Sequence, residues 1–271
     1  FHWQGGHVVD PQPASDADLD ASRALLLAAQ RFGDPAYRSA ALRIGQSVLS
    51  AETAVLGGHR VLLAGPWTHE YLDPSYLSPR TFAALGQASG DSAWGQLTTA
   101  GYALVAQLQQ GGPGLPPDWA TVSPAGAASA AAAPSGGGAP VYGYDAGRVL
   151  VRMAEDCSAR GRAIAAKPWP WLAAQIAKGQ LAAQYGLDGT ARVDYSSPLA
   201  NVAAAASATA AGDHGQAAAL LDKAEASDRA EPTYYGAAWV AVGRIMLTTN
   251  WLGGCGVLSV RAGQRRVEGY G

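Results

Sequence analysis

The sequence is poor in charged residues, in cysteine and in long apolar runs, and each shortage excludes a class of function. Charged residues make up 15% of the 271 positions, the formal net charge is -2, and no basic cluster stands out. This balance argues against binding to nucleic acid or to an anionic membrane surface. No run of about 18 apolar residues occurs, so a membrane span is not expected. A neutral substrate fits this composition best.

Only two cysteines are present, Cys157 and Cys255, and their wide separation lacks the paired spacing of a metal site or a redox motif. We expect them either to form one disulfide or to remain two buried thiols. The five histidines include no i, i+4 pair. The sequence also lacks a Gly-x-Ser-x-Gly elbow and a phosphate-binding loop with its Lys. No metal and no cofactor are therefore expected.

Helical periodicity dominates what is present. Apolar residues recur at helical spacing from Asp16 to a stop at Gly33, and again from Ala36 to Glu52. Further helices are predicted near 79–88, 92–109, 145–159, 168–185, 198–211, 214–226 and 233–248, which makes about nine in all. The best strand candidate is the short run from Arg60 to Leu63. The predicted fold class is therefore all-α.

The chain is expected to form a single domain over residues 1–271. The Ala-rich and then Gly-rich segment 123–140 has the composition of a linker, but helical pairs continue on both sides of it, so we predict a surface loop. Helix pairs that alternate with long loops favour either a helical toroid or a helical repeat array. No period repeats in the sequence, which favours the toroid.

Two acidic clusters lie at predicted helix starts. Asp16, Asp18 and Asp20 alternate through the first turn of one helix, where the helix dipole favours anions, and capping alone is the common explanation. Asp145 begins another helix, with Arg148 three residues later and within side-chain reach. A carboxylate paired with Arg and flanked by Tyr is typical of a general base in glycoside hydrolysis, although a structural ion pair is the commoner outcome.

Trp and Tyr concentrate in the predicted loops. Sugar rings stack their apolar faces on aromatic side chains while their hydroxyls hydrogen-bond to Asp, Arg and Tyr. The loops are therefore consistent with a cleft for a polysaccharide, and the alternative is a set of aromatic plugs at the ends of a helical barrel. The aromatic residues concerned are Trp3, Trp67, Tyr71, Tyr76, Trp119, Tyr142 and Tyr144.

Four motifs, in the same order, resemble glycoside hydrolase family 8, a group of bacterial endoglucanases, cellulases, chitosanases, lichenases and xylanases. The stretch from Ala14 to Phe32 is similar to the family's Ala-Ser/Thr-Asp-Ala/Gly-Asp signature and the helix that follows. Segments 73–79, 114–119 and 144–148 resemble its Asn-Pro-Ser-Tyr-Phe-x-Pro, Gly-Leu-x-Pro-Asp-Trp and Tyr-Asp-Ala-x-Arg motifs. The resemblance implies an (α/α)6 barrel, here apparently without about its first three helices. It also implies an inverting, endo-acting hydrolase of β-1,4-glucan.

The resemblance assigns roles to the acidic clusters. Asp145 matches the family's general base, which takes a proton from the attacking water. Arg148 and Tyr76 then help to hold that base and its water. Asp16 matches the residue that hydrogen-bonds the distorted sugar at the cleavage subsite, where contacts strengthen in the transition state. Asp18 is left with a structural role.

The resemblance also implies aromatic contacts to the substrate, and it shows that the segment with the family's general acid is missing from this sequence. Trp67 and Trp3 resemble stacking platforms of the cleft, and Tyr234 or Tyr235 matches a Tyr near the family's C-terminus. The family's general acid is a Glu in a Ser-Glu-Gly-Gln-Ser-Tyr-Gly-like segment upstream of the position of Phe1, and no such segment occurs here. We therefore expect a separate or cleaved N-terminal piece to supply the acid, and a secreted or periplasmic location.

Three alternatives to an active hydrolase remain open at this stage. The sequence could be a processed or inactive fragment, or a non-catalytic relative that binds β-glucan without cleaving it. A helical scaffold unrelated to sugar is the third, and it predicts scattered positions for Asp16, Tyr76 and Asp145. The mutual positions of these three side chains in a structure decide that last alternative.

Overall fold

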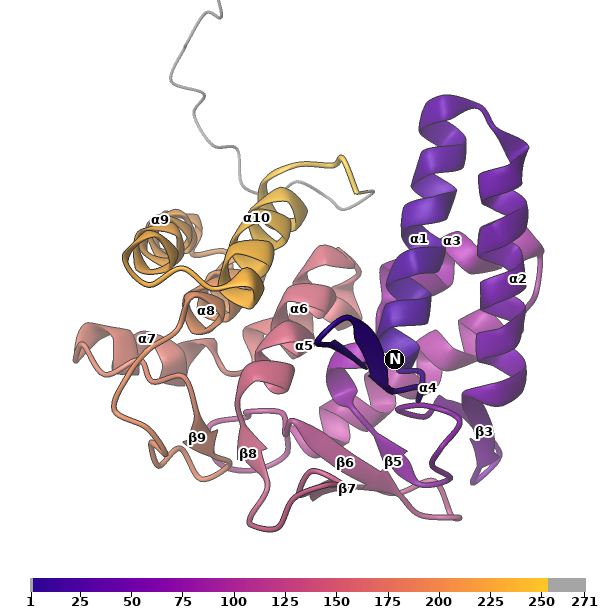
Figure 1. Ribbon diagram of the computed structural model, residues 1–271. Coiled ribbons are helices and arrows are strands. Elements are labelled where there is room, and N and C mark those ends of the chain that lie inside the picture. The colour runs from indigo at the N-terminus through magenta and orange to yellow at the C-terminus, as the bar shows by residue number, and fades with distance from the viewer. Residues whose placement is uncertain (1, 253–271) are drawn as a thin grey trace, which may run out of the picture.

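The computed structural model describes residues 2–252, which form ten α-helices, one 3-10 turn and nine short strands (Figure 1). The helices are α1 Ser15–Phe32, α2 Pro35–Ala51, α3 Pro79–Ser89, α4 Ala93–Leu108, α5 Tyr144–Glu155, α6 Ala159–Ala166, α7 Trp169–Ala177, α8 Pro198–Ala211, α9 His214–Ala230 and α10 Tyr234–Thr248, and the 3-10 turn η1 is Pro74–Tyr76. The strands are β1 His2–Gln4, β2 His7–Asp10, β3 Thr53–Leu56, β4 His59–Leu62, β5 Tyr71–Leu72, β6 Trp119–Val122, β7 Ala128–Ala131, β8 Val141–Tyr142 and β9 Tyr185–Gly186. The predicted all-α class is confirmed.

Local capping sets most helix boundaries. Helix α1 ends where Gly33 adopts φ 73° and donates its N–H to the carbonyl of Ala29. Asp34 then caps α2 by accepting a hydrogen bond from Ala36 N, and Pro35 occupies the first helical position. The expected stop after α1 and the immediate restart of α2 are both confirmed.

Two predicted helices end earlier than expected. The helix expected over 145–159 ends at Glu155, because Cys157 adopts φ 65° and Ser158 caps the separate helix α6. The helix expected over 168–185 ends near Gly179, which has φ 70°. Helix α6 was not predicted as a separate helix for this reason, and the described residues form ten α-helices where about nine were expected. The pairing of Cys157 with Cys255 stays a prediction, since Cys255 lies outside the described residues.

The strands form small sheets rather than a structural layer. Their sheet orders are β1-β2, β3-β4, β5-β6-β7 and β8-β9, all antiparallel. The strand expected at Arg60–Leu63 is largely β4. Segment 123–140, predicted as a surface loop, is mostly exposed and contains β7, which pairs with β6. Its alanines gave no sign of this strand in the sequence.

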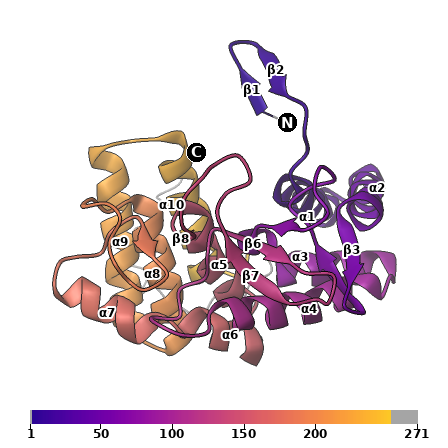
Figure 2. The same ribbon diagram turned by 90° about the horizontal axis from the view of Figure 1, so that it is seen from below.

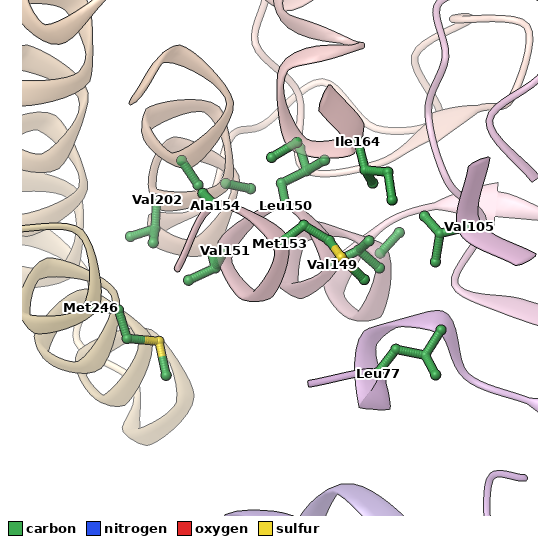
Figure 3. Close-up of a cluster of buried hydrophobic side chains, with 14 of the residues drawn as sticks. Leu77, Val105, Val149, Leu150, Val151, Met153, Ala154, Ile164, Val202 and Met246 are labelled. Carbon is green, nitrogen blue, oxygen red and sulfur yellow. The ribbon is translucent and has the colours of Figure 1, made fainter. Parts of the chain in front are cut away.

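Helix α5 is the central helix of the fold. All its residues from Ala146 to Glu155 are buried, and it packs against α3, α6, α8, α10 and η1. Figure 3 shows Leu150, Val151 and Met153 of α5 among apolar side chains contributed by neighbouring elements. Figure 2 shows the helices α1 to α4 on one side of α5 and α7 to α10 on the other, with the β1-β2 hairpin projecting from the body. Within residues 2–252, no helix is long and apolar enough to cross a membrane.

Three ion pairs, which we call the α1–α5 ladder, join the central helix to α1. Each joins residues 132 positions apart, so the two helices run parallel and in register. The pairs are Asp16 with Arg148, Asp20 with Arg152, and Arg23 with Glu155. The ladder places the first turns of α1 and α5 side by side.

Candidate active site

The first turns of α1 and α5 meet beside the turn η1, and one guanidinium joins all three. Arg148 lies one turn into α5, with 10% of its side chain exposed. Its Nη2 donates to Asp145 Oδ1 at 2.6 Å, and its Nη1 donates to Asp16 Oδ2 at 2.9 Å. Nη2 also lies 3.4 Å from Oδ2 of Asp73, the residue before η1. We call these four residues the Arg148 cluster.

The carboxylates around Arg148 keep it charged. Burial by itself lowers the pKa of Arg148, but surrounding acidic groups, Asp145 and Asp16 among them, raise it above its usual value. The ring of Tyr76 stacks on the guanidinium, 5.6 Å from its carbon to the ring centroid. The permanently charged guanidinium of Arg148 therefore fixes the relative positions of three aspartates.

The three aspartates differ in their access to solvent. The side chain of Asp145 is 32% exposed, that of Asp16 is 19% exposed, and that of Asp73 is fully buried. Asp145 uses one oxygen for Arg148, and its Oδ2 accepts no hydrogen bond from the residues that the structure describes. Asp145 can therefore contact a water molecule from its open side, whereas Asp73 cannot.

Asp118 anchors the start of α5, a role that the sequence analysis did not assign. Its Oδ1 accepts hydrogen bonds from Gly143 N at 2.8 Å and Ala146 N at 2.7 Å, on either side of Asp145. Burial raises the pKa of Asp118 to about 6 against these two bonds, which lower it. A Cβ at Gly143 would lie 2.7 Å from Asp118 Oδ2, so this contact requires glycine. The position of Asp118 in the motif at 114–119 was the signal in the sequence that could have indicated this role.

Tyr76 lies where the sequence analysis expected it, next to the guanidinium. Burial raises the pKa of Tyr76 well above its usual value, and the charge of Asp16 adds to this effect. Its hydroxyl therefore stays protonated and able to donate a hydrogen bond. Asp16, Tyr76 and Asp145 are thus gathered around Arg148, which is not the scattered arrangement expected of an unrelated helical scaffold.

Of the two candidate tyrosines at the start of α10, the structure brings Tyr235 to the cluster. Tyr234 is 92% exposed. Tyr235 packs edge-on against Tyr144, with ring centroids 6.4 Å apart, and its hydroxyl donates to the Tyr144 carbonyl at 3.4 Å. Burial raises the pKa of Tyr235 to about 12, while the nearby Arg148 lowers it. The sequence could not separate two adjacent tyrosines, because only helix packing decides which one faces inward.

Trp67 lies close to the start of α1. Its indole N–H donates to the carbonyl of Pro13 at 3.1 Å, and its ring lies 6.4 Å from that of Trp119. With 37% exposure, it helps to line a surface hollow of about 580 Å³ that also includes Tyr71. Trp3 is on β1, but its side chain lies outside the described part of the chain. Within residues 2–252, no three His, Cys, Asp or Glu residues are grouped as metal ligands.

A second pair of carboxyls supports the start of α1. Ser15 connects the start of α1 to the residue that follows β4, since its Oγ donates a hydrogen bond to Leu63 O at 2.7 Å. Glu52 is 3% exposed, and burial raises its pKa to about 7, with a hydrogen bond to Asp18 as the next cause. A protonated Glu52 can share its proton with Asp18. Asp18 therefore has the structural role that the resemblance implied.

Replacing Glu52 by Gln is expected to make the folded protein more stable at alkaline pH. A carboxyl whose pKa is raised on folding binds more protons in the folded state, so stability falls as pH rises from about 4.5 to about 7. The Gln variant lacks this loss, so its free energy of unfolding should exceed that of the parent by about 3 kcal/mol at pH near 8. Urea unfolding at both ends of this range measures the difference.

The exposed Glu231→Gln change is a matched control that should leave the pH dependence unchanged. An equal fall in stability with pH for the parent and the Glu52→Gln protein would contradict the prediction.

Comparisons with known proteins find related sequences. The family model for "Glycosyl hydrolases family 8" matches residues 4–246. Endoglucanase A of Acetivibrio thermocellus is 32% identical over 154 residues, or 54% of this chain and 30% of that protein. A probable endoglucanase of Novacetimonas hansenii is 33% identical over 159 residues, or 55% of this chain and 46% of that protein. The chain therefore spans less than half the length of these curated relatives.

A solved structure supports the fold over nearly all of the chain. The endo-beta-1,4-glucanase of Acetobacter xylinum superposes with a TM-score of 0.71 and 26% identity, covering 90% of this chain and 73% of that one. The expected (α/α)6 barrel type is confirmed by neighbours of this kind.

Proposed function

The chain belongs to family 8 of the glycosyl hydrolases, and on that premise we propose that it cleaves β-1,4-glucan internally and with inversion, using Asp145 as the general base. The observation that carries this proposal is the partly exposed Asp145, held at 2.6 Å by an arginine that also holds Asp16. A base that removes a proton from water needs both a fixed orientation and an open side. Asp145 has both.

Asp145, Asp16 and Arg148 of the Arg148 cluster and the adjacent Tyr76 have different roles in hydrolysis. Asp145 takes a proton from a water molecule, whose oxygen attacks the anomeric carbon on the face opposite the leaving group. Asp16 hydrogen-bonds the sugar at the cleavage subsite, and these bonds strengthen as the ring approaches the oxocarbenium shape. Tyr76 stays protonated and donates toward the water or the sugar. Arg148 fixes Asp16 and Asp145 relative to each other.

Aromatic rings near the cluster supply stacking surfaces for further sugar units. Trp67 presents a partly exposed ring beside the start of α1, and we assign it to a sugar subsite together with Trp3. We assign a sugar contact near Arg148 to Tyr235 rather than to Tyr234, because Tyr235 packs on Tyr144 and lies near the guanidinium. Polymeric glucan does not cross a cell membrane, so the proposed reaction takes place in the periplasm or outside the cell.

The general acid is proposed to come from outside this chain. Inverting hydrolysis needs a second carboxyl roughly 6.5 to 9.5 Å from the base, to protonate the leaving oxygen. Asp16 and Asp73 share the guanidinium that holds Asp145, which suits them to positioning rather than to the opposite face. An apolar hollow of about 350 Å³ between α1 and α10, lined by Leu27 and Trp239 among others, supports a further segment or separate chain that packs there and carries a Glu.

A substrate with an activated leaving group tests the base without the acid. In a dinitrophenyl cello-oligosaccharide, the dinitrophenolate group leaves without protonation. We therefore expect this chain alone to hydrolyse that substrate and to release the α-anomer, while it cleaves cellulose far more slowly. Proton NMR of the first product identifies the anomer. Release of the β-anomer would contradict inversion, and no hydrolysis with retained oligosaccharide affinity would favour a glucan-binding relative instead.

A further inference from the structure

Asp73 is the buried member of the Arg148 cluster, and hydrolysis as described above does not use it. Its side chain is fully buried between β5 and η1. Its Oδ1 accepts a hydrogen bond from Ser75 N at 2.8 Å, which caps the turn η1. Its Oδ2 lies 3.4 Å from Arg148 Nη2, the same nitrogen that donates to Asp145 at 2.6 Å. Two aspartates therefore approach the same nitrogen, which has an N–H group for each of them, and they share its positive charge.

The groups that face Asp73 leave little positive charge for it. They come from α1, η1, α5 and α10, and the guanidinium is the one cation among those that the structure describes. The next arginine along α5, Arg152, is already bidentate to Asp20 at 2.8 and 2.7 Å. The facing groups are Asp16, Tyr76, Asp145, Arg148 and Tyr235.

We propose that Asp73 is a positioning residue that works in its neutral, protonated form, and that its ionisation draws Arg148 away from Asp145. In the neutral form, Asp73 fixes the guanidinium without competing for its charge, and Nη2 stays with the base. In the charged form, Asp73 attracts the guanidinium as a second buried carboxylate, and this attraction weakens the contact between Nη2 and Asp145. The part of this inference that concerns activity rests on the proposed function.

The distances fit a neutral Asp73. Charge-assisted hydrogen bonds between arginine and a carboxylate are about 2.7 to 2.9 Å long, and the bonds to Asp145 and Asp16 are near that range. The 3.4 Å separation from Asp73 is longer than this, although Asp73 is the most deeply buried of the three. An ionised carboxylate with no access to water would be expected to hold the shortest bond of the set, because nothing else solvates it.

Electrostatics point the same way. Burial raises the pKa of Asp73 well above its usual value, and the charge of Asp145 adds to this. Arg148 and the Ser75 amide act in the opposite direction but do not cancel it. A carboxyl with a raised pKa favours the folded state at low pH, and this advantage is lost as pH rises through the raised value. Both stability and activity should therefore fall on the alkaline side.

The Asp73→Asn change tests the inference, because Asn keeps the acceptor for Ser75 N and cannot ionise. We expect the urea midpoint of the parent to fall as pH rises through the raised pKa of Asp73, while that of the Asn variant changes much less. We also expect the Asn variant to keep kcat/KM within about threefold of the parent near pH 6 and to extend its alkaline limb by about one pH unit or more. Asp73→Ala, which loses the acceptor, should lose activity at every pH.

The exposed Asp222→Asn change is the matched control and should alter neither profile. Carbon-13 NMR of Asp-labelled protein gives a readout that needs no substrate, since one carboxyl resonance should titrate at a higher pH than the other aspartates and be absent from the Asn variant. A loss of activity by Asp73→Asn at all pH values, with KM unchanged, would overturn the inference. So would identical urea profiles for the two proteins. If neither protein hydrolyses the dinitrophenyl cello-oligosaccharide, the proposed function fails, while the urea and NMR results still decide the state of Asp73.

Discussion

Replacing Asp145 by Asn is expected to lower kcat on β-1,4-glucan by about three orders of magnitude, with KM nearly unchanged. The amide keeps its oxygen toward Arg148 and so preserves the 2.6 Å contact that holds the first turn of α5. It cannot accept a proton from water, so the chemical step loses its base. The measurement is the initial rate of reducing-end release, made on the protein together with whatever segment supplies the acid.

Azide separates a missing base from a damaged fold in this variant. As an anion, azide attacks the anomeric carbon without a base, so it should restore activity to the Asn variant and give a glycosyl azide of inverted configuration. The parent protein should not respond in this way. Activity of the Asn variant within about tenfold of the parent, or a retained anomeric configuration, would remove Asp145 from the role of base.

Replacing Glu155 by Gln is expected to lower the free energy of unfolding by about 3 to 5 kcal/mol. Glu155 is the last rung of the α1–α5 ladder, and its side chain is fully buried against Arg23, which is 8% exposed. Arg23 Nη1 donates to Glu155 Oε2 at 3.0 Å, and its Nη2 donates to Oε1 and to the carbonyl of Leu252. The neutral amide leaves the arginine as an uncompensated buried charge, which is the costly outcome.

Two comparison variants identify the cause of this loss. Removing both charges, as in Arg23→Met with Glu155→Leu, should recover much of the stability, because apolar side chains of similar size carry no desolvation penalty. Glu225→Gln, which breaks an exposed pair with Arg229, should cost less than about 1 kcal/mol. Urea unfolding at neutral pH measures all three. A Glu155→Gln protein as stable as the parent would show that the ladder does not stabilise the packing of α1 on α5.

Helix boundaries were largely predictable because their signals are local. The Gly33 stop, the Asp34 cap and Pro35 each act within one turn of the chain. The break between α5 and α6 was missed because it depends on the left-handed backbone at Cys157. Cysteine rarely adopts this conformation, and the neighbouring residues do not indicate it. Strand β7 was missed because alanines have no strand preference and pair only where β6 is already in place.

The candidate site was partly predictable. The motif at 144–148 gave the i, i+3 pair of Asp145 and Arg148, which needs only one helical turn. The resemblance to a known family placed Asp16 and Tyr76 with them, and the structure brings all four together. Neither source of information gave the anchoring role of Asp118 or the choice of Tyr235 over Tyr234.

The sequence by itself determined the helices, their caps and the pair at the start of α5, since each depends on residues within about four positions of one another. The tertiary structure decided that Arg148 also holds Asp16, 132 positions away, and lies beside Asp73, 75 positions away. It likewise decided that Asp73 is buried while Asp145 reaches solvent. Burial and the sharing of charge between distant residues follow from how α1, η1 and α5 pack, and no local pattern carries that information.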